Sequence, residues 1–242
     1  MAAIGGVEEF MQHISKVCDI ESVFDGLFES HLKVMVGGFG RGGTPFSLID
    51  ALCRKHPLYH GLTIIKNDGN EPGLGVDLLF QKQMVTKVIS THIGLNPDLI
   101  ARMNRGDIAV ELHPQGIFAE KIRAAGAGIP AFLSDVGIDT VIANDREKIE
   151  FNGSTWLLET ALPGDVALLC ADVADELGNC VWRGSNRNMS VVMGTACPRV
   201  LVEAKKIVAP GEIAPEDVHL PALFVSRVVQ AGPRAHMNGG RQ

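Results

Sequence analysis

The sequence predicts an α/β protein with a mostly parallel sheet flanked by helices on both faces. Its apolar runs are short and continuous, which is typical of strands that are covered on both sides. Segments with helical spacing of apolar residues separate these runs, so that strands and helices alternate along the chain. The 242 residues are enough for one such unit with a large core. We therefore predict a single domain over residues 1–242.

The N-terminal part of the chain is expected to be helical over about the first thirty residues. The apolar side chains that share one helical face there are Phe10, Ile14 and Val17. An apolar strand follows at 32–36 and runs directly into glycine. The next helix is expected over 44–56, with Thr44 as its N-cap and Pro45 at its first position, where the missing N–H costs nothing.

Strands and helices continue to alternate through the rest of the chain. Further apolar runs that predict strands lie at 62–66, 84–91, 108–112, 155–159, 166–171, 180–182, 199–204 and 223–229. One helix is expected to start at Asn96, and another to follow Pro114 and to stop at Gly126. Polar residues interrupt this pattern over 134–156, where we expect an excursion from the sheet, such as a hairpin, inside the same domain. The tail after Pro233 lacks core-forming residues, and we expect it to be frayed.

Charge and composition exclude several classes of protein. The 22 Lys and Arg residues against 28 Asp and Glu residues give a net charge of −6, so the basic footprint of a nucleic-acid-binding protein is absent. No apolar run approaches the roughly 20 residues that span a bilayer, and the first residues do not resemble a secretory signal. The five cysteines are widely spaced and form no CxxC motif, which indicates reduced thiols rather than a zinc site. We therefore expect a cytoplasmic protein without a membrane, nucleic-acid or metal partner.

The most informative motif is a glycine-rich segment between the first strand and the next helix. It consists of Gly37, Gly38, Phe39, Gly40, Arg41, Gly42 and Gly43. Backbone amides in such a loop can point at a ligand, and the N-terminus of the following helix favours an anion. A tight strand-to-helix turn without a ligand is the alternative, because glycine serves turns as well as sites. A P-loop is excluded, since no lysine follows Gly43.

A second interpretation of the same loop is that it belongs to a dinucleotide-binding enzyme. The GxGxxG pattern is satisfied by Gly38, Gly40 and Gly43. Asp68 lies near the end of the next strand, where a ribose-binding acid is expected. Two features weaken this reading: Gly37 starts the glycine run one residue early, and Asp68 belongs to an Asn-Asp-Gly-Asn sequence that is typical of a turn. An NAD(P)-dependent oxidoreductase therefore stays an alternative.

The glycine segment also resembles the GGF-x3-G-x-P signature of the α subunits of family I coenzyme A transferases. Further segments that are similar to this family, in the same order, are LTIIKND (62–68), GLGVDLL (73–79), ISTHIGLNPD (89–98), NGSTWLLE (152–159) and LGNCVWRGSNRN (177–188). The longest is VELHPQGIFAEKIRAAGAGIPAFLSDVGIDT (110–140), which matches the family's ELxPQG pattern and most positions after it. The resemblance covers roughly residues 14–229 and implies the family I coenzyme A transferase fold.

The resemblance implies an enzyme that moves coenzyme A between two carboxylic acids. In this family a glutamate attacks the acyl-CoA carbonyl and forms an anhydride, the CoA thiolate then forms a glutamyl-CoA thioester, and the acceptor carboxylate reverses both steps. The resemblance places that glutamate on a partner β subunit, in an αβ or α2β2 assembly. Coenzyme A is then a substrate, no cofactor is bound permanently, and this chain alone is expected to be inactive.

For this chain, the resemblance implies a contribution to the substrate site. Gln115 is expected to orient the substrate or to donate to an oxyanion, and Gly116 beside it allows close approach of a ligand. The segment Gly37–Gly43 is expected to border the acyl-CoA, with Phe39 against the thioester or the pantetheine arm and Arg41 near an anionic group.

The remaining polar residues of the matched segments divide into one substrate candidate and several structural residues. Asn67 is a candidate for orienting the acyl carboxylate, whereas Asn96 is interpreted as a helix cap because it precedes a Pro-Asp pair. The glutamates that we interpret as surface or salt-bridging residues rather than nucleophiles are Glu111, Glu120, Glu159 and Glu203. His92 and His113 receive no catalytic role, since carboxylates attack already ionised.

Three departures from the family pattern leave the acyl substrate open. The segment Arg187–Ser190 retains one of the family's two asparagines, the segment Asn144–Arg146 replaces a lysine-containing one, and Ile117 stands where Thr or Asn is common. A relative that decarboxylates or hydrolyses CoA esters therefore stays an alternative. A non-catalytic scaffold protein that has kept the fold is another.

Overall fold

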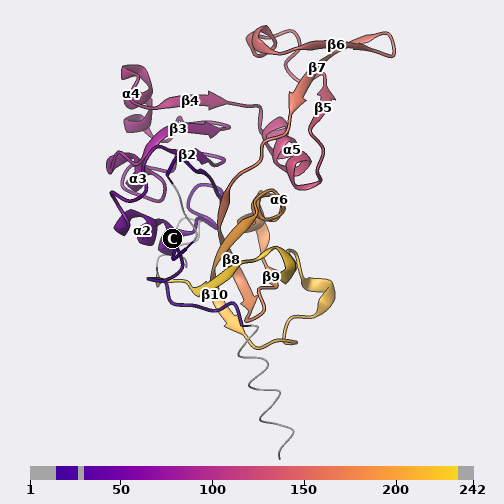
Figure 1. The fold of residues 1–242 in the computed structure, drawn as a ribbon. Helices are drawn as coiled ribbons and strands as arrows, with labels where there is room; N and C mark the ends of the chain where they lie inside the picture. Colours follow the sequence, from indigo (N-terminus) through magenta and orange to yellow (C-terminus); the bar gives the residue numbers. More distant parts are fainter. Residues whose placement is uncertain (1–14, 27–29, 234–242) are drawn as a thin grey trace, which may run out of the picture.

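The computed structural model describes residues 15–26 and 30–233, and its main feature is an eight-stranded sheet (Figure 1). The seven strands along the sheet are β1 (Lys33–Val36), β2 (Leu62–Ile65), β3 (Val85–Ser90), β4 (Ala109–Leu112), β8 (Val166–Asp175), β10 (Arg199–Val208) and β11 (Arg227–Gln230). They lie in the order β11-β10-β8-β1-β2-β3-β4, and every neighbouring pair is parallel. The short strand β9 (Cys180–Val181) pairs with β8 in the antiparallel direction. The predicted α/β fold with a mostly parallel sheet is confirmed.

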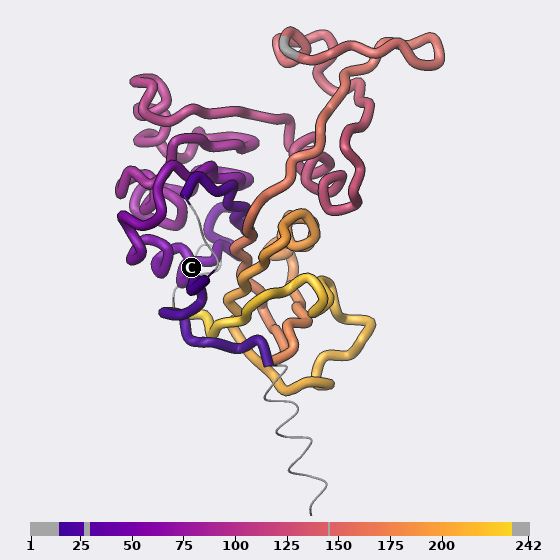
Figure 2. Tube along the Cα trace, viewed as in Figure 1, coloured from indigo at the N-terminus to yellow at the C-terminus, as the bar shows by residue number. Residues whose placement is uncertain are grey.

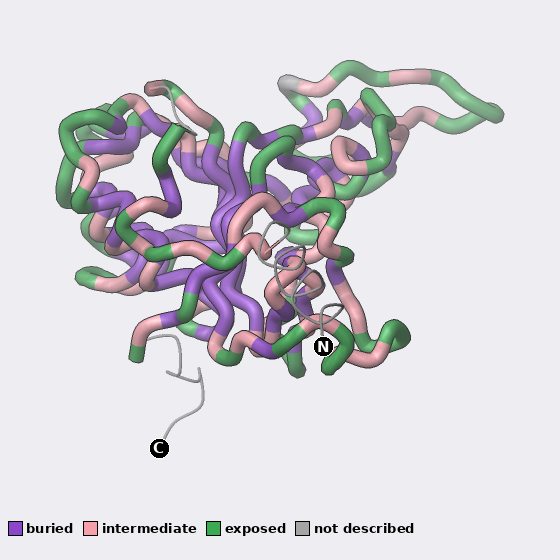
Figure 3. Tube along the Cα trace, turned by 60° about the horizontal axis from the view of Figure 1, so that its bottom comes forward, coloured by how far each residue is buried: buried purple, intermediate pink, exposed green. Residues whose placement is uncertain are grey.

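Helices cover both faces of this sheet. They are α2 (Phe46–Arg54), α3 (Asp77–Gln81), α4 (Pro97–Arg105), α5 (Gln115–Gly126) and α6 (Ser190–Thr195). Successive side chains of a strand point to opposite faces. Val34 and Val36 of β1 accordingly pack in one core with Leu48 of α2, whereas Met35 packs in a second core with Phe118 of α5. Figure 3 shows this buried layer, in which the strands run through the middle of the molecule.

The chain changes direction across the sheet between β1 and β8. From β1 it adds β2, β3 and β4 toward one edge, and it then returns to the other side of β1 with β8, β10 and β11. In open parallel sheets, ligands bind outside the carboxyl ends of the strands at such a switch point. The glycine segment follows β1 directly, so the topology places it at this point.

Residues between α5 and β8 form a separate three-stranded antiparallel sheet. Its strands are β5 (Ala131–Ser134), β6 (Lys148–Phe151) and β7 (Ser154–Thr160), in the order β5-β7-β6. Figures 1 and 2 show this sheet projecting away from the main sheet. Asn152 and Gly153 turn the β6–β7 hairpin with φ values of 51° and 75°, which suit a two-residue turn. The apolar run at 155–159 is therefore a strand of this smaller sheet and not of the parallel one.

The segment before β1 is not helical where the structure describes it. Over residues 15–26 the chain first pairs with β11, where the Val228 amide donates to Lys16 O at 2.8 Å. It then forms turns over 20–26, and the Arg227 guanidinium donates to two carbonyl groups of these turns. Pairing with an edge strand thus outweighs the helical spacing of the apolar residues, and the predicted helix is wrong here. The rest of that predicted helix lies outside the described residues.

Two further predictions of element ends need correction. The run at 223–229 becomes a strand only from Arg227, because Ala222–Phe224 form a 3-10 turn after a proline. Helix α5 ends at Gly126 as predicted, but the left-handed residue is Gly128, with a φ of 71°. Gly126 instead allows close packing on α6, since a Cβ there would lie 2.3 Å from Thr195 Oγ1. The tail after Pro233 lies outside the described residues.

The remaining short elements connect the strands. They are the 3-10 helices η1 (Val141–Asp145), η2 (Gly184–Arg187), η3 (Pro215–Asp217) and η4 (Ala222–Phe224). None of the helices in the described part of the chain has the length and apolar character that crossing a bilayer would need. Asn96 caps α4 as predicted, because its side-chain oxygen accepts from the Leu99 amide at 2.9 Å.

Candidate active site

The glycine segment forms a tight turn at the carboxyl end of β1. Phe39 N donates to Gly42 O at 2.8 Å, and Gly42 N donates back to Phe39 O at 3.1 Å. Gly40 stands at the tip with a φ of 56°, a left-handed conformation that favours glycine. Gly38 is needed for space, because a Cβ there would lie 2.5 Å from Thr44 N. The loop therefore has one defined shape that its glycines permit.

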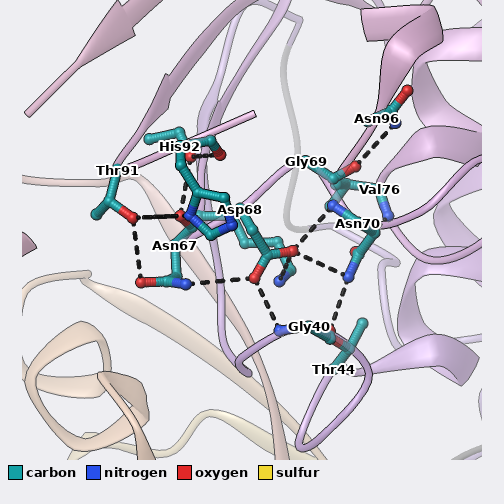
Figure 4. A network of polar contacts seen from close by, with 12 residues as sticks. Gly40, Thr44, Asn67, Asp68, Gly69, Asn70, Val76, Thr91, His92 and Asn96 are labelled. Carbon is teal, nitrogen blue, oxygen red and sulfur yellow. Dashed lines mark hydrogen bonds and ion pairs between the residues drawn. The ribbon is translucent and has the colours of Figure 1, made fainter. Parts of the chain in front are cut away.

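A buried network holds the tip of this loop (Figure 4). The Gly40 amide donates to Asp68 Oδ2 at 2.8 Å. The Asn70 side chain and the Thr44 hydroxyl donate to Gly40 O at 2.8 and 2.7 Å. Asp68 in turn forms an ion pair with Lys66 at 3.1 Å, and both of these side chains are buried. The loop tip is thus fixed through both its amide and its carbonyl.

Burial and charge act in opposite directions on this ion pair. Burial lowers the pKa of Lys66, and Asp68 opposes part of that effect. Burial raises the pKa of Asp68, but Lys66 and two backbone amides together hold it below its ordinary value. The network therefore favours an ionised Asp68 whose carboxylate is committed to the loop.

Helix α2, which follows the loop, has no side-chain cap of its own. Pro45 occupies the cap position, and Thr44, the predicted cap, donates its hydroxyl to Gly40 O instead. That carbonyl in the preceding loop lies within reach of the hydroxyl, which explains why the prediction for Thr44 is wrong. The first turn of α2 is held from another element, because Leu48 N donates at 2.9 Å to Glu203 Oε2 on β10.

The contacts of Asp68 and Glu203 contradict the hypothesis that the loop binds a dinucleotide. A pyrophosphate would need the amides at the N-terminus of α2, but Glu203 already accepts from the Leu48 amide. A ribose would need Asp68, but that side chain is 1% exposed and is committed to Lys66 and the loop. The helix terminus that the sequence predicts to favour an external anion thus binds a group of the same chain.

Asn67 lies below the surface at the end of β2. Its backbone oxygen accepts from the Thr91 and Ser90 hydroxyls at 2.7 and 3.0 Å. Its side-chain amide donates to Asp68 at 3.4 Å, and the residue is completely buried. Asn67 therefore belongs to the support of the loop, and its contact with an acyl carboxylate stays a prediction.

Gln115 and Gly116 open helix α5 at the end of β4. Pro114 is the residue before the helix, and the two residues after it are exposed. The Gln115 side chain makes no hydrogen bond to any described residue. A Cβ at Gly116 would meet nothing within 4 Å. The Gln115 amide is therefore free to bind a ligand at the same edge of the sheet as the glycine loop.

The predicted site residues are spread along this edge. Phe39 is 48% exposed on the loop, and Arg41 forms an ion pair with the half-buried Glu71. Since strands β2 and β3 lie between β1 and β4, a strand spacing of about 4.8 Å puts the ends of β1 and β4 roughly 14 Å apart. A ligand that touches both the loop and Gln115 must therefore extend across the ends of these strands. No group of three His, Cys, Asp or Glu side chains in the described ranges is arranged to hold a metal ion.

Three of the four candidate glutamates pair with cations. The pairs are Glu111–Lys87 at 2.7 Å, Glu120–Arg123 at 2.6 Å and Glu159–Lys121 at 2.9 Å. His113 and Lys87 lower the pKa of Glu111 to about 2. The interpretation as salt-bridging residues is confirmed for these three. It is wrong for Glu203, which is completely buried, forms no ion pair with a described residue, and has its pKa raised by burial to about 7.

A segment that sequence reasoning does not assign to the site packs against the glycine loop. A Cβ at Gly43 would lie 2.6 Å from Asn186 O, and a Cβ at Gly37 would lie 2.8 Å from Ser190 Oγ. Asn188 between them has a φ of 35° and a ψ of −123°, a strained backbone for a residue other than glycine. Its Oδ1 and the Ser190 hydroxyl are buried without a hydrogen-bond partner among the described residues. The signal for this segment in the sequence is the similarity of residues 177–188 to the family, of which Asn188 is a retained asparagine.

The sequence that carries this site matches a known family. A sequence model described as Coenzyme A transferase matches residues 21–231, which is most of the chain. The chain belongs to the coenzyme A transferase family. The resemblance that begins with the Gly37–Pro45 signature is thereby confirmed.

This coenzyme A transferase chain is similar to single subunits of named enzymes. It is 38% identical over 214 residues to one of the subunits of the succinyl-CoA:3-ketoacid coenzyme A transferase of Xanthomonas campestris, with 88% of each chain covered. It is 35% identical over 216 residues to the alpha subunit of the acetoacetyl-CoA:acetate/butyrate CoA transferase of Clostridium acetobutylicum, with 89% of this chain and 98% of that one covered.

A solved structure shares the fold. The crystal structure of an acyl-CoA transferase from Escherichia coli O157:H7 aligns over 94% of this chain with a TM-score of 0.81 and 21% identity. The present chain spans 49% of the length of that structure. Together with the named relatives, the family match identifies this chain as part of a coenzyme A transferase enzyme.

Proposed function

We propose that this chain is the α subunit of a two-subunit enzyme that moves CoA between an acyl-CoA and a short-chain carboxylate or 3-oxoacid. Its relatives are named as single subunits of such enzymes, and their names contain succinyl-CoA, acetoacetyl-CoA, acetate and butyrate. The structural neighbour is about twice as long as this chain, which supports a second unit of similar size. That unit is the proposed β subunit, in an αβ or α2β2 assembly.

The observation that carries the proposal concerns the acids of the matched segments. The edge of the sheet presents a shaped loop and a free amide, but none of the four candidate glutamates is available as a nucleophile. Glu111, Glu120 and Glu159 are held in ion pairs. Glu203 is enclosed in the core. An attacking carboxylate must reach the acyl carbon, so we assign it to the partner subunit.

The proposed reaction proceeds in two displacements and their reverse. The partner's glutamate attacks the thioester carbon and the C–S bond breaks. The CoA thiolate departs, and an acyl-glutamyl anhydride is formed. The thiolate then attacks the glutamyl carbon and releases the donor carboxylate, which leaves a glutamyl-CoA thioester. The acceptor carboxylate reverses both steps, so no water is consumed and the thioester is conserved. Coenzyme A is a substrate in this scheme and not a resident cofactor.

Residues of this chain are proposed to bind and orient the substrate. The Gly37–Gly43 loop borders the acyl-CoA, with Phe39 against the thioester or the pantetheine arm. Gln115 donates its free amide to the developing oxyanion or to the substrate carboxylate, and one well-aimed donor contributes about 3 kcal/mol to such a step. The exposure of Gln115 and the rigid support of the loop favour these roles.

Mass spectrometry of the complex tests the proposal. The tagged chain is purified together with its partner, incubated with acetyl-CoA, and digested. The proposal expects a CoA adduct on a glutamate of the co-purified chain, which acetate releases, and no adduct on this chain. An adduct on any residue of this chain would overturn its assignment as the α subunit. Loss of acetyl-CoA without carboxylate-dependent exchange would instead support a diverged hydrolase or decarboxylase, and no reaction in the intact complex would support a scaffold.

The cytoplasm is the proposed location. All five cysteines are free thiols, and four of them are buried. Reducing compartments keep such thiols in this state, which favours the cytoplasm.

Native mass spectrometry of the same complex distinguishes an αβ from an α2β2 assembly.

A further inference from the structure

The buried carboxyl of Glu203 joins two parts of the sheet that lie on opposite sides of the switch point. Glu203 lies on β10, beyond β8 from β1, whereas α2 connects β1 to β2. Its Oε2 accepts from the Leu48 amide at 2.9 Å, and the residue has no exposed surface. The contact therefore ties the second half of the chain to the helix that follows the glycine loop.

This carboxyl replaces the cap that α2 lacks. Pro45 at the cap position has no side-chain oxygen, and Phe46 N is bonded to Thr44 O at 3.0 Å. Leu48 N is the third amide of the helix, which a cap residue normally satisfies. The same first turn is joined to the loop through Thr44, whose hydroxyl donates to Gly40 O. Fraying of this turn would therefore release one anchor of the loop.

The surroundings of the carboxyl make this contact specific. Its Oε2 accepts from the Leu48 amide, its Oε1 is buried without a hydrogen-bond partner among the described residues, and the side chains of Ser47 and Cys170 lie beside it. No described cation pairs with it. The Ser47 hydroxyl also accepts from the Gly232 amide at 2.8 Å, so the chain after β11 meets the same turn. An apolar residue at position 203 would leave the Leu48 amide buried without a partner.

We propose that Glu203 is a positioning residue of the acyl-CoA site, which acts through α2 to hold the Gly37–Thr44 loop in its binding geometry. This inference rests on the proposed role of the loop. Glu203 is enclosed and does not touch the substrate. Its loss weakens binding of the acyl-CoA, while the chemistry on the partner's glutamate and the Gln115 end of the site are unaffected.

Kinetics of three variants test the proposal in the complex with the partner subunit, with acetyl-CoA as the donor. In Glu203→Ala and Glu203→Asp no group reaches the Leu48 amide, and the KM for acetyl-CoA rises by about tenfold or more, while kcat changes by less than about twofold. Glu203→Gln keeps an acceptor of the same length, so its KM stays within about threefold of the wild type. Loss of a residue that is merely structural would lower the amount of folded enzyme, without a rise in KM at a nearly constant kcat.

Hydrogen exchange over residues 37–48 gives a readout that does not depend on activity. Exchange of these amides is expected to rise by about tenfold or more in Glu203→Ala, and Glu203→Gln is expected to restore most of the protection. The matched control is Glu159→Ala, which removes another buried carboxyl, on β7, that pairs with Lys121. It should leave exchange over 37–48 unchanged.

Several outcomes would overturn the proposal. Unchanged exchange and unchanged KM in Glu203→Ala would do so, as would equal loosening of the loop by Glu159→Ala. If the alanine variant does not fold, Glu203→Asp carries the same comparison. If the loop loosens but wild-type complex does not bind acetyl-CoA, Glu203 still positions the loop, and the assignment of the loop to acyl-CoA fails.

Discussion

Lys66 Nζ lies 3.1 Å from Asp68 Oδ1, and both side chains are buried beneath the glycine loop. Residues two apart in an extended segment point to the same side, which brings the pair together at the end of β2. Asp68 also accepts from the Gly40 amide, so the pair connects β2 to the loop after β1. The shape of the loop therefore depends on a buried pair of charges.

Removal of one partner of this pair should be more harmful than removal of both. Asp68→Asn leaves the Lys66 ammonium buried without its counter-charge, and we expect the free energy of unfolding to fall by about 3–5 kcal/mol. The double variant Lys66→Met/Asp68→Asn should be more stable than Asp68→Asn alone, because no buried charge remains. Urea denaturation measures the free energy of unfolding of both variants. Asp98→Asn, on the exposed first turn of α4, is the control and should cost less than about 1 kcal/mol.

Glu203 should make stability depend on pH. Burial raises its pKa from an ordinary 4.5 to about 7, so the folded state holds the proton more tightly than the unfolded state. Its contribution to stability is therefore complete below pH 4.5 and is lost as the pH rises through about 7. We expect the wild type to lose up to about 3 kcal/mol relative to Glu203→Gln across this window.

Unfolding free energies of the wild type and of Glu203→Gln, measured at several pH values across that window, check this expectation. The difference between the two curves cancels other groups that titrate in the same range. Parallel curves would show that Glu203 has an ordinary pKa in the folded protein.

Gln115→Ala should separate activity from stability. Its side chain is exposed and makes no hydrogen bond to a described residue, so we expect the free energy of unfolding to change by less than about 0.5 kcal/mol. Loss of an oxyanion donor should lower kcat by about 10²- to 10³-fold in the complex with the partner. Glu120→Gln, on the same helix and paired with Arg123, is the control and should keep the wild-type rate. Full activity of Gln115→Ala would remove Gln115 from the site.

Gly116→Ala should stabilise the protein while it lowers activity. A Cβ there meets nothing within 4 Å, and alanine in the first turn of α5 favours the helix by about 0.5–1 kcal/mol. The same methyl group occupies the space in which a ligand would approach Gln115, so the KM for acetyl-CoA should rise. Thermal unfolding and CoA exchange measure the two effects.

Gly106→Ala is the contrasting variant for that measurement. A Cβ at Gly106 also meets open space, but its φ of 79° disfavours alanine, so this variant should lose stability and keep its activity. A wild-type KM in Gly116→Ala would show that the ligand does not approach this helix end.

The layers of the fold can be predicted because local patterns report burial. The continuous apolar runs at 62–66 and 166–171 are strands covered on both faces, and Asn96 before a proline is a helix cap. The run at 155–159 shows the limit of this reasoning. It is a strand as predicted, but its apolar pattern carries no information on which sheet it joins, and it pairs with β5 and β6 instead of β8.

Part of the candidate site is also open to local reasoning. The glycine segment and Gln115 lie at one edge of the sheet because the carboxyl ends of parallel strands share an edge. The partner of Thr44 is not predictable in this way, since its choice between the helix amides and Gly40 O depends on how the loop folds. Asn188 is visible in the sequence as the one asparagine of the family motif that the chain retains, but its strained backbone is not, because strain leaves no pattern in composition or periodicity.

The amino-acid sequence alone specifies the alternation of strands and helices, the glycines that permit the loop, and the family to which the motifs belong. The partners of individual polar groups depend on the folded topology. Glu203 and Leu48 are 155 positions apart, and they meet because β10 returns to the side of β1 that α2 covers. Periodicity indicates whether a residue is buried, but a hydrogen bond also requires that a particular donor and acceptor be brought together, and only the packed chain does that.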